Sequence, residues 1–132
     1  MNLSPYSAPG ILTARLPKSD PAIEAERFCA AVEAASAAHF DVTVKDIYGN
    51  SQRSSIVKAR HACIYLILQA GVMNTVSLGQ RYNRDHSTIV MAKKRISGFL
   101  QVRDHITTAA ISHLRNTCPI PYPIKNKRYD NR

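Results

Sequence analysis

The chain has 132 residues, of which 45% are hydrophobic and 20% are charged, and it carries a formal net charge of +9. This length fits one domain, and the hydrophobic fraction is too high for a disordered chain. No apolar run approaches the roughly 20 residues of a membrane-spanning helix, and the N-terminus lacks the basic-then-apolar order of a signal peptide, so we expect a cytoplasmic protein without a membrane partner.

The positive charge is concentrated in the later part of the chain. Residues 1–50 contain four Lys or Arg and six Asp or Glu, whereas residues 51–132 contain fourteen and three. The two parts therefore carry −2 and +11. Such segregation indicates a binding face for a polyanion more than a surface that serves solubility alone.

Residues 1–19 and 119–132 are expected to lie outside the folded domain. The first segment contains three prolines and no sustained periodicity, which predicts a flexible arm, and the second is a basic tail that begins at a proline. Between them, apolar residues recur at helical spacing, and no segment alternates apolar and polar residues for long enough to predict a strand. Residues 20–118 are therefore expected to form an all-α bundle of about six helices.

The first three expected helices lead to the most apolar part of the chain. A helix at about 20–39 begins with an Asp-Pro pair, which is typical of a helix N-terminus, and a threonine caps a short helix at about 43–48. A polar, basic connection at 51–55 precedes a helix at about 54–70. This helix is apolar on most sides, so we expect other helices to surround it.

The next two helices have the pattern of a helix-turn-helix at about 74–101. A short helix at about 75–82 and a long helix capped at Asp85 are joined by a tight turn, and small Gly79 should let the two approach closely. A last helix is expected at about 104–116, before a run of prolines. The residues expected on the inner faces of these three helices are Val76, Leu78, Gly79, Ile89, Ala92, Ile96, Phe99, Leu100, Ile106, Ala110, Ile111 and Leu114.

The start of the long helix carries side chains suited to reading DNA. Asp85 either caps the helix or offers its carboxylate to a cytosine amine. His86, Ser87 and Thr88 follow in the first turn, where free backbone N–H groups also face outward. Hydroxyl groups donate to phosphates or bases, and the Thr methyl can contact a thymine methyl. A helix of this kind can place its N-terminal residues in a DNA groove while its body is held by a hydrophobic core.

Two groups of basic residues flank this helix start. Lys93, Lys94 and Arg95 lie on the same helix and are expected to contact phosphates, although a solvated basic run on an amphipathic helix explains them equally well. Arg53 lies in the connection before the central helix, where it can reach into a minor groove or serve as an ordinary loop residue. Lys58 and Arg60 follow in the first turns of that central helix, with no acidic residue among the three.

From about residue 32 to residue 114, the chain resembles the C-terminal DNA-binding domain of the bacterial replication initiator DnaA. The matching pieces include Val-Lys-Asp-Ile at 44–47, Val-Ser-Leu-Gly at 76–79 and Arg-Asp-His-Ser-Thr at 84–88, of which the last is the most specific. The chain departs from the family at Asn83, where glycines are common.

The resemblance implies a role for each matching residue. Asp85, His86 and Ser87 would read bases in the major groove, and Arg53 would enter the minor groove. Thr88, Arg60 and either Lys93 or Lys94 would hold phosphates. The full set of expected DNA-binding residues is Arg53, Lys58, Arg60, Arg84, Asp85, His86, Ser87, Thr88, Lys93 and Lys94.

We expect no enzyme activity, metal or cofactor. The three cysteines form no CxxC pair, the five histidines include no HExxH motif, and the chain has no GxxxxGK[ST] loop, so we expect neither a nucleotide nor an ATPase module. Asp85, His86 and Ser87 cannot form a catalytic relay, because consecutive residues on a helix point about 100° apart.

The sequence therefore predicts a sequence-specific double-stranded DNA-binding protein that is associated with the nucleoid and regulates transcription or replication. The alternative is an interaction module that binds an acidic protein partner through its basic face, its first helix or the arm at 1–19. The extra helical turns at 20–35 and the proline-rich ends motivate this alternative, because DNA reading does not require them.

Overall fold

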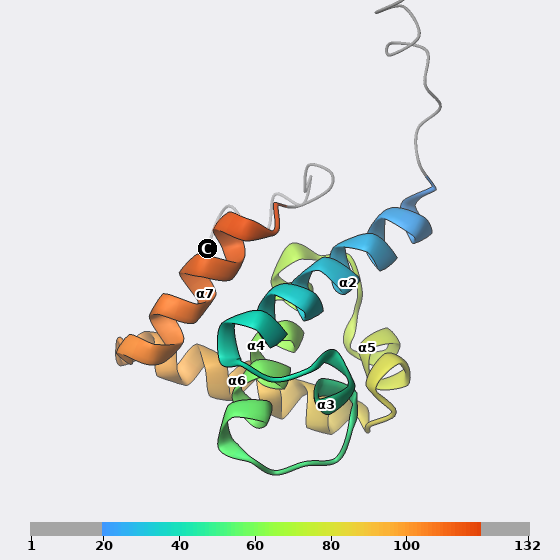
Figure 1. The fold of residues 1–132 in the computed structure, drawn as a ribbon. Coiled ribbons are helices and arrows are strands. Elements are labelled where there is room, and N and C mark those ends of the chain that lie inside the picture. Colours follow the sequence, from blue (N-terminus) through green and yellow to red (C-terminus); the bar gives the residue numbers. More distant parts are fainter. Residues whose placement is uncertain (1–19, 120–132) are drawn as a thin grey trace, which may run out of the picture.

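Helix α4 (Ser54–Ala70) lies at the centre of the computed structural model, which describes residues 20–119 (Figure 1). Its main neighbours are α2 (Pro21–Phe40) and α6 (His86–Gln101). Residues 62–67 of α4 are all buried, so this helix has no solvent-facing side over nearly two turns. The prediction of a central helix at 54–70 is confirmed.

The remaining helices pack around this core. Helix α3 (Val44–Tyr48) contacts α2 and α4, α5 (Thr75–Tyr82) packs against α6, and α7 (His105–Thr117) closes the bundle against α2, α4 and α6. Between residues 20 and 119 the structure contains six helices and no strand, so the all-α prediction is confirmed. The predictions for residues 1–19 and 120–132 fall outside the described residues.

Short polar side chains fix where several helices begin. Thr43 and Asp46 form a capping box, in which the Thr43 hydroxyl accepts from the Asp46 N–H at 3.0 Å and the Asp46 carboxylate accepts from the Thr43 N–H at 3.2 Å. Asn74 accepts from the Ser77 N–H at 2.8 Å at the start of α5. These bonds satisfy backbone donors that have no partner within the helix. They explain why the predicted and observed starts agree.

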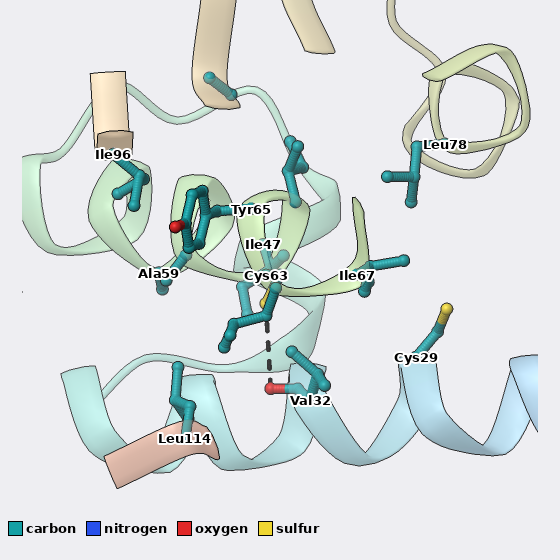
Figure 2. Packing of buried hydrophobic residues seen from close by; sticks show 14 of the residues in the cluster. Cys29, Val32, Ile47, Ala59, Cys63, Tyr65, Ile67, Leu78, Ile96 and Leu114 are labelled. Carbon is teal, nitrogen blue, oxygen red and sulfur yellow. Dashed lines mark hydrogen bonds between the residues drawn. The ribbon is translucent and has the colours of Figure 1, made fainter. Parts of the chain in front are cut away.

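The most extensive helix–helix interface of the described residues is that between α2 and α4 (Figure 2). Cys29 and Val32 project from α2 toward α4, and the Cys63 thiol lies 3.9 Å from the Val32 carbonyl oxygen. Burial raises the pKa of Cys63 to about 12, so this thiol stays neutral in the core. Cys29, Cys63 and Cys118 are all free and buried.

Three of the residues predicted on inner faces are exposed. Val76, Phe99 and Ile106 have 57%, 45% and 57% of their surface accessible, so the inward prediction for them is wrong. Helix α5 packs mainly on α6, and only its side bearing Leu78, Gly79 and Tyr82 is buried. Phe99 and Ile106 instead line a hollow where α4, α6 and α7 diverge, and they do not fill it.

None of the helices between residues 20 and 119 combines the length and the apolar character needed to cross a bilayer.

Candidate nucleic-acid interface

Helices α5 and α6 form a helix-turn-helix with a tight turn. The chain leaves α5 at Asn83, which adopts the left-handed conformation with φ 54° and ψ 50°. Asparagine tolerates this conformation better than most residues, so it can stand where glycine is common. The Arg84 N–H then donates to the Gly79 carbonyl at 2.8 Å and closes the turn.

Gly79 is required by this close approach. A Cβ atom added at Gly79 would lie 2.7 Å from the carbonyl oxygen of Arg84, which is backbone and cannot move freely. The expectation that a small residue allows the two helices to meet is therefore confirmed. Because the turn sets where α6 begins, Gly79 also controls how the start of α6 is presented.

We predict that Gly79→Ala lowers the free energy of unfolding by about 2 kcal/mol, because the turn must open to admit the methyl group. The matched control is Gly98→Ala in α6, where an added Cβ meets nothing within 4 Å. That change should stabilise the protein by roughly 0.5–1 kcal/mol through helix propensity. Urea denaturation followed by far-UV circular dichroism measures both, and equal effects at the two glycines would contradict the close contact.

The start of α6 presents a group of exposed polar side chains. Asp85, His86, Ser87 and Thr88 are all exposed, whereas Ile89 directly after them is fully buried. Asp85 is the N-cap residue by position, yet its carboxylate accepts no capping hydrogen bond. It is therefore available to an external donor. The buried Ile89 anchors the first turn, so these four residues are held at the surface by the core beneath them.

The ring of His86 is fixed by the neighbouring helix. Its Nδ1 atom lies 3.1 Å from the hydroxyl oxygen of Thr75, the first residue of α5. A hydrogen bond at Nδ1 restricts the ring orientation and leaves Nε2 directed elsewhere. This contact couples the two helices of the motif at their solvent-facing ends.

Lys93 and Lys94 are exposed on α6, as is the following residue, Arg95. Ala92 and Ile96 on either side are buried, so the apolar stripe of α6 faces the core and the three cations lie off it. Lys93 lines an open hollow beside the first residues of α5, whose free N–H groups are also favourable to anions.

Arg53 is the exposed N-cap residue of α4, at the end of the loop that precedes this helix. Its N–H donates to the Ser51 hydroxyl at 3.1 Å, and its guanidinium makes no hydrogen bond to residues 20–119. Lys58, one turn into α4, is half-buried. Within the described part of the chain, the Arg53 side chain is thus exposed and without a hydrogen bond, while the Lys58 side chain is partly covered.

Arg60 occupies a different place from the one expected. It is only 4% exposed, and its guanidinium donates to four backbone carbonyls, those of Asp46, Ile47, Gly49 and Ser51, at 2.8–3.2 Å. Burial and the neighbouring charge of Arg84 lower its pKa. Four of the five guanidinium N–H donors are thus used inside the protein. Arg60 therefore shapes this loop, and its predicted phosphate contact stays a prediction.

Arg84 bridges the turn of the motif and the same loop. Its guanidinium donates to the Tyr82 carbonyl at 2.9 Å and to the Gly49 carbonyl at 2.6 Å, and the side chain is half-buried. Arg84 and Arg60 therefore share the Gly49 carbonyl. This shared acceptor ties the connection that carries Arg53 to the turn that precedes α6. Sequence patterns gave no signal for the bridge, because its two ends are 35 residues apart.

A buried ionic cluster holds α5 against the rest of the bundle. Glu33 of α2 is 2% exposed, and its carboxylate accepts from the hydroxyls of Tyr48 and Tyr82 and from Nε and Nη2 of Arg81, all at 2.6–3.0 Å. Burial is the largest cause that raises the pKa of both tyrosines, so they remain hydroxyl donors. Nη1 of Arg81 also pairs with exposed Glu26 at 2.6 Å. Sequence reasoning did not identify this cluster, since its members come from three helices.

The described residues hold no group of three or more His, Cys, Asp or Glu side chains arranged to bind a metal ion. His61 of α4 has its pKa lowered to about 4 by burial first and then by the charges of Arg95, Arg60 and Arg84. It is therefore neutral at pH 7 and adds no charge to the basic surface.

Comparison with known proteins gives consistent results. A model of the family described as "Bacterial dnaA protein helix-turn-helix" matches residues 29–96, which include α3 to α5 and most of α6. The chain is similar to the chromosomal replication initiator protein DnaA of several bacteria. It is 35% identical over 72 residues to that of Clavibacter sepedonicus, covering 54% of this chain and 15% of the relative.

Two further relatives show the same extent of similarity. The Mycobacteroides abscessus protein is 30% identical over 81 residues, which are 58% of this chain and 16% of the relative. The Tropheryma whipplei protein is 37% identical over 65 residues, which are 49% and 14%. The matched region thus spans about one-sixth of the length of these relatives or less.

Proposed function

Because the chain belongs to the bacterial dnaA protein helix-turn-helix family, we propose that it is a sequence-specific double-stranded DNA-binding protein. The observation that carries this proposal is the exposed polar group at the start of α6, held above a buried isoleucine and flanked by cations. Helix-turn-helix proteins read bases with the N-terminal residues of their second helix. The relatives are named as replication initiators, so a role in regulating replication or transcription at the nucleoid follows most directly.

In this proposal, Asp85, His86 and Ser87 contact base edges in the major groove. The uncapped carboxylate of Asp85 suits a cytosine amine, and the oriented ring of His86 offers Nε2 to a base or phosphate. Thr88 lies at the end of the same turn, where it suits a phosphate. The exposed hydroxyls of residues 87 and 88 can each donate or accept.

The cations supply the sequence-independent part of the affinity. Lys93 and Lys94 contact phosphates beside the groove, and Arg53 reaches into the adjacent minor groove from the loop before α4. Lys58 and Arg84 contribute positive potential from half-buried positions. If about six phosphates are neutralised, the logarithm of the binding constant should fall against the logarithm of salt concentration with a slope near roughly −5.

A selection from random duplexes tests the proposal directly. We expect it to enrich a single motif, because base-reading side chains favour some sequences over others. Enrichment of no motif would remove the sequence-specific part and leave only electrostatic DNA binding.

Two variants separate base reading from phosphate contact once the motif is known. Ser87→Ala should relax the preference at one base position by about 1 kcal/mol, and it should leave the salt slope unchanged. Lys94→Ala should weaken selected and scrambled duplexes alike and reduce the salt slope by about 1. Fluorescence anisotropy at several salt concentrations measures both quantities. The assignment fails if Ser87→Ala weakens every duplex equally.

A further inference from the structure

A hollow of about 300 Å³ lies between α4, α6 and α7, away from the polar group at the start of α6. Its walls are mostly apolar and include Val57, Ile96 and Ile111. Phe99 and Ile106, both largely exposed, stand at its edge. Large apolar side chains exposed around a concave site are typical of a place where another molecule binds.

The charged side chains that line this hollow are all positive. The ionisable side chains that line it are Lys58, His61 and Arg95, and no Asp or Glu of the described chain is among the lining residues. The carboxylate of Asp104 lies near enough to feel the charge of Lys58, but it accepts the Thr107 N–H as the cap of α7 and does not line the hollow. An anionic group at the edge of the hollow would therefore find positive charge there.

We infer that this hollow is a binding site for a small amphipathic anion, an aromatic or short aliphatic carboxylate. The apolar part would lie against Ile96 and Phe99, and the carboxylate would face Lys58 and Arg95. The volume decides in favour of a small molecule, because about 300 Å³ is at the lower end of ligand pockets and is too small for the face of a partner helix.

A ligand bound in this hollow should also affect DNA binding. Only this regulatory consequence rests on the proposed function. Lys58 borders the hollow and also lies one turn from Arg53 in the same region of α4. A bound anion would neutralise part of the positive potential there, so DNA affinity should fall. The ligand site itself does not depend on DNA binding and is tested without DNA.

The test uses the full chain and three probes that share one apolar body: 4-phenylbutyrate, its neutral amide and 4-phenylbutylamine. Titration followed by ¹H–¹⁵N NMR should give saturable shifts at residues lining the hollow with 4-phenylbutyrate. The amide should bind at least about fivefold more weakly, and the amine should not bind measurably, since the lining cations repel it. No saturable shift with 4-phenylbutyrate, or equal binding of carboxylate and amide, would overturn the inference.

Matched variants locate the site. Phe99→Ala and Arg95→Gln should each weaken 4-phenylbutyrate binding by about fivefold or more, because they remove an apolar wall and a cation. The controls are Val102→Ala, which removes an exposed apolar side chain near the end of α6, and Lys94→Gln, which removes the same charge one residue away. Neither control residue lines the hollow. Equal losses in a variant and its control would refute this location.

Two further measurements distinguish the remaining outcomes. A short acidic peptide containing one phenylalanine should bind more weakly than 4-phenylbutyrate; if it alone binds, the occupant is a protein segment and the small-ligand assignment is wrong. Saturating 4-phenylbutyrate should reduce affinity for the selected duplex about two- to threefold. If DNA affinity stays unchanged while 4-phenylbutyrate saturates the hollow, the effect on DNA binding is refuted, but the assignment of a ligand site still holds.

Discussion

Glu33→Gln is expected to lower the free energy of unfolding by about 3 kcal/mol, because it removes one charge from a buried ion pair and leaves the other. The partner is Arg81, whose side chain is only 12% exposed and whose pKa is raised chiefly by its hydrogen bonds to Glu33. In the variant, this guanidinium keeps its contact with Glu26 but loses the buried carboxylate that accepts two of its hydrogen bonds. Urea denaturation at neutral pH measures the loss.

The matched control is Glu26→Gln, which acts on the same arginine from the surface. Glu26 has a side chain that is 60% exposed, and its pKa is lowered mainly by its hydrogen bond to Arg81. An exposed ion pair contributes at most about 1 kcal/mol, so this variant should be nearly neutral. Similar losses in the two variants would show that burial of Glu33 does not set the energy of the cluster.

Glu33→Gln should also affect DNA binding indirectly. Helix α5 packs mainly on α6, and the Arg81 and Tyr82 contacts to Glu33 connect α5 to α2. Loosening them weakens the hold on α5, while α6 stays packed on α4. We therefore expect weaker binding with an unchanged preferred sequence, since no base-reading side chain is altered.

Arg60→Met is expected to cost a similar amount, about 3 kcal/mol, because the Ile47 and Ser51 carbonyls lose the donor that satisfies them. The Asp46 and Gly49 carbonyls each lose one of two donors, since they also accept from the Gly49 N–H and from Arg84. Three of these carbonyls belong to residues 46, 47 and 49, at the end of α3, and the fourth is that of Ser51. Each buried acceptor left without a partner costs about 1–3 kcal/mol, and partial access of water to the loop reduces the total. Thermal or urea unfolding of the variant measures this effect.

A second measurement on the same variant decides whether Arg60 also contacts DNA. If it makes no phosphate contact, the salt slope of DNA binding should stay unchanged while the stability falls. Arg53→Met provides the opposite control, since the exposed Arg53 guanidinium makes no hydrogen bond to residues 20–119. The free energy of unfolding should stay constant while DNA affinity falls. If the salt slope of Arg60→Met is smaller in magnitude by about 1, Arg60 does contact a phosphate.

Much of the candidate site could be predicted because its signals are local. The group at 85–88 is marked by a helix start next to a basic run, and both lie within a few residues. Gly79 and the turn at Asn83 are likewise set by neighbouring backbone. Exposure of residues 85–88 follows from their place in the first turn, ahead of the buried stripe that begins at Ile89.

The errors arise where the outcome depends on which surfaces meet. Phe99 and Ile106 have the spacing of buried residues, yet the helices diverge around them and leave a hollow. The burial of Arg60 was likewise not predicted, and it arises because the loop after α3 wraps over its guanidinium. Helical periodicity reports only which face is apolar, and it does not say how far a neighbouring helix covers that face.

By itself, the sequence determined the helices, their caps and turn, and the cationic polar surface at the start of α6, because these depend on spacings of a few residues. Only the tertiary structure decided which charged residues are available to a partner. Arg60 and Arg81 are the same residue type, but their guanidinium groups have different partners. Arg60 donates to loop carbonyls, whereas Arg81 donates to a carboxylate 48 residues away in the sequence. Long-range contacts of this kind are made by the packing of whole helices, which no local pattern encodes.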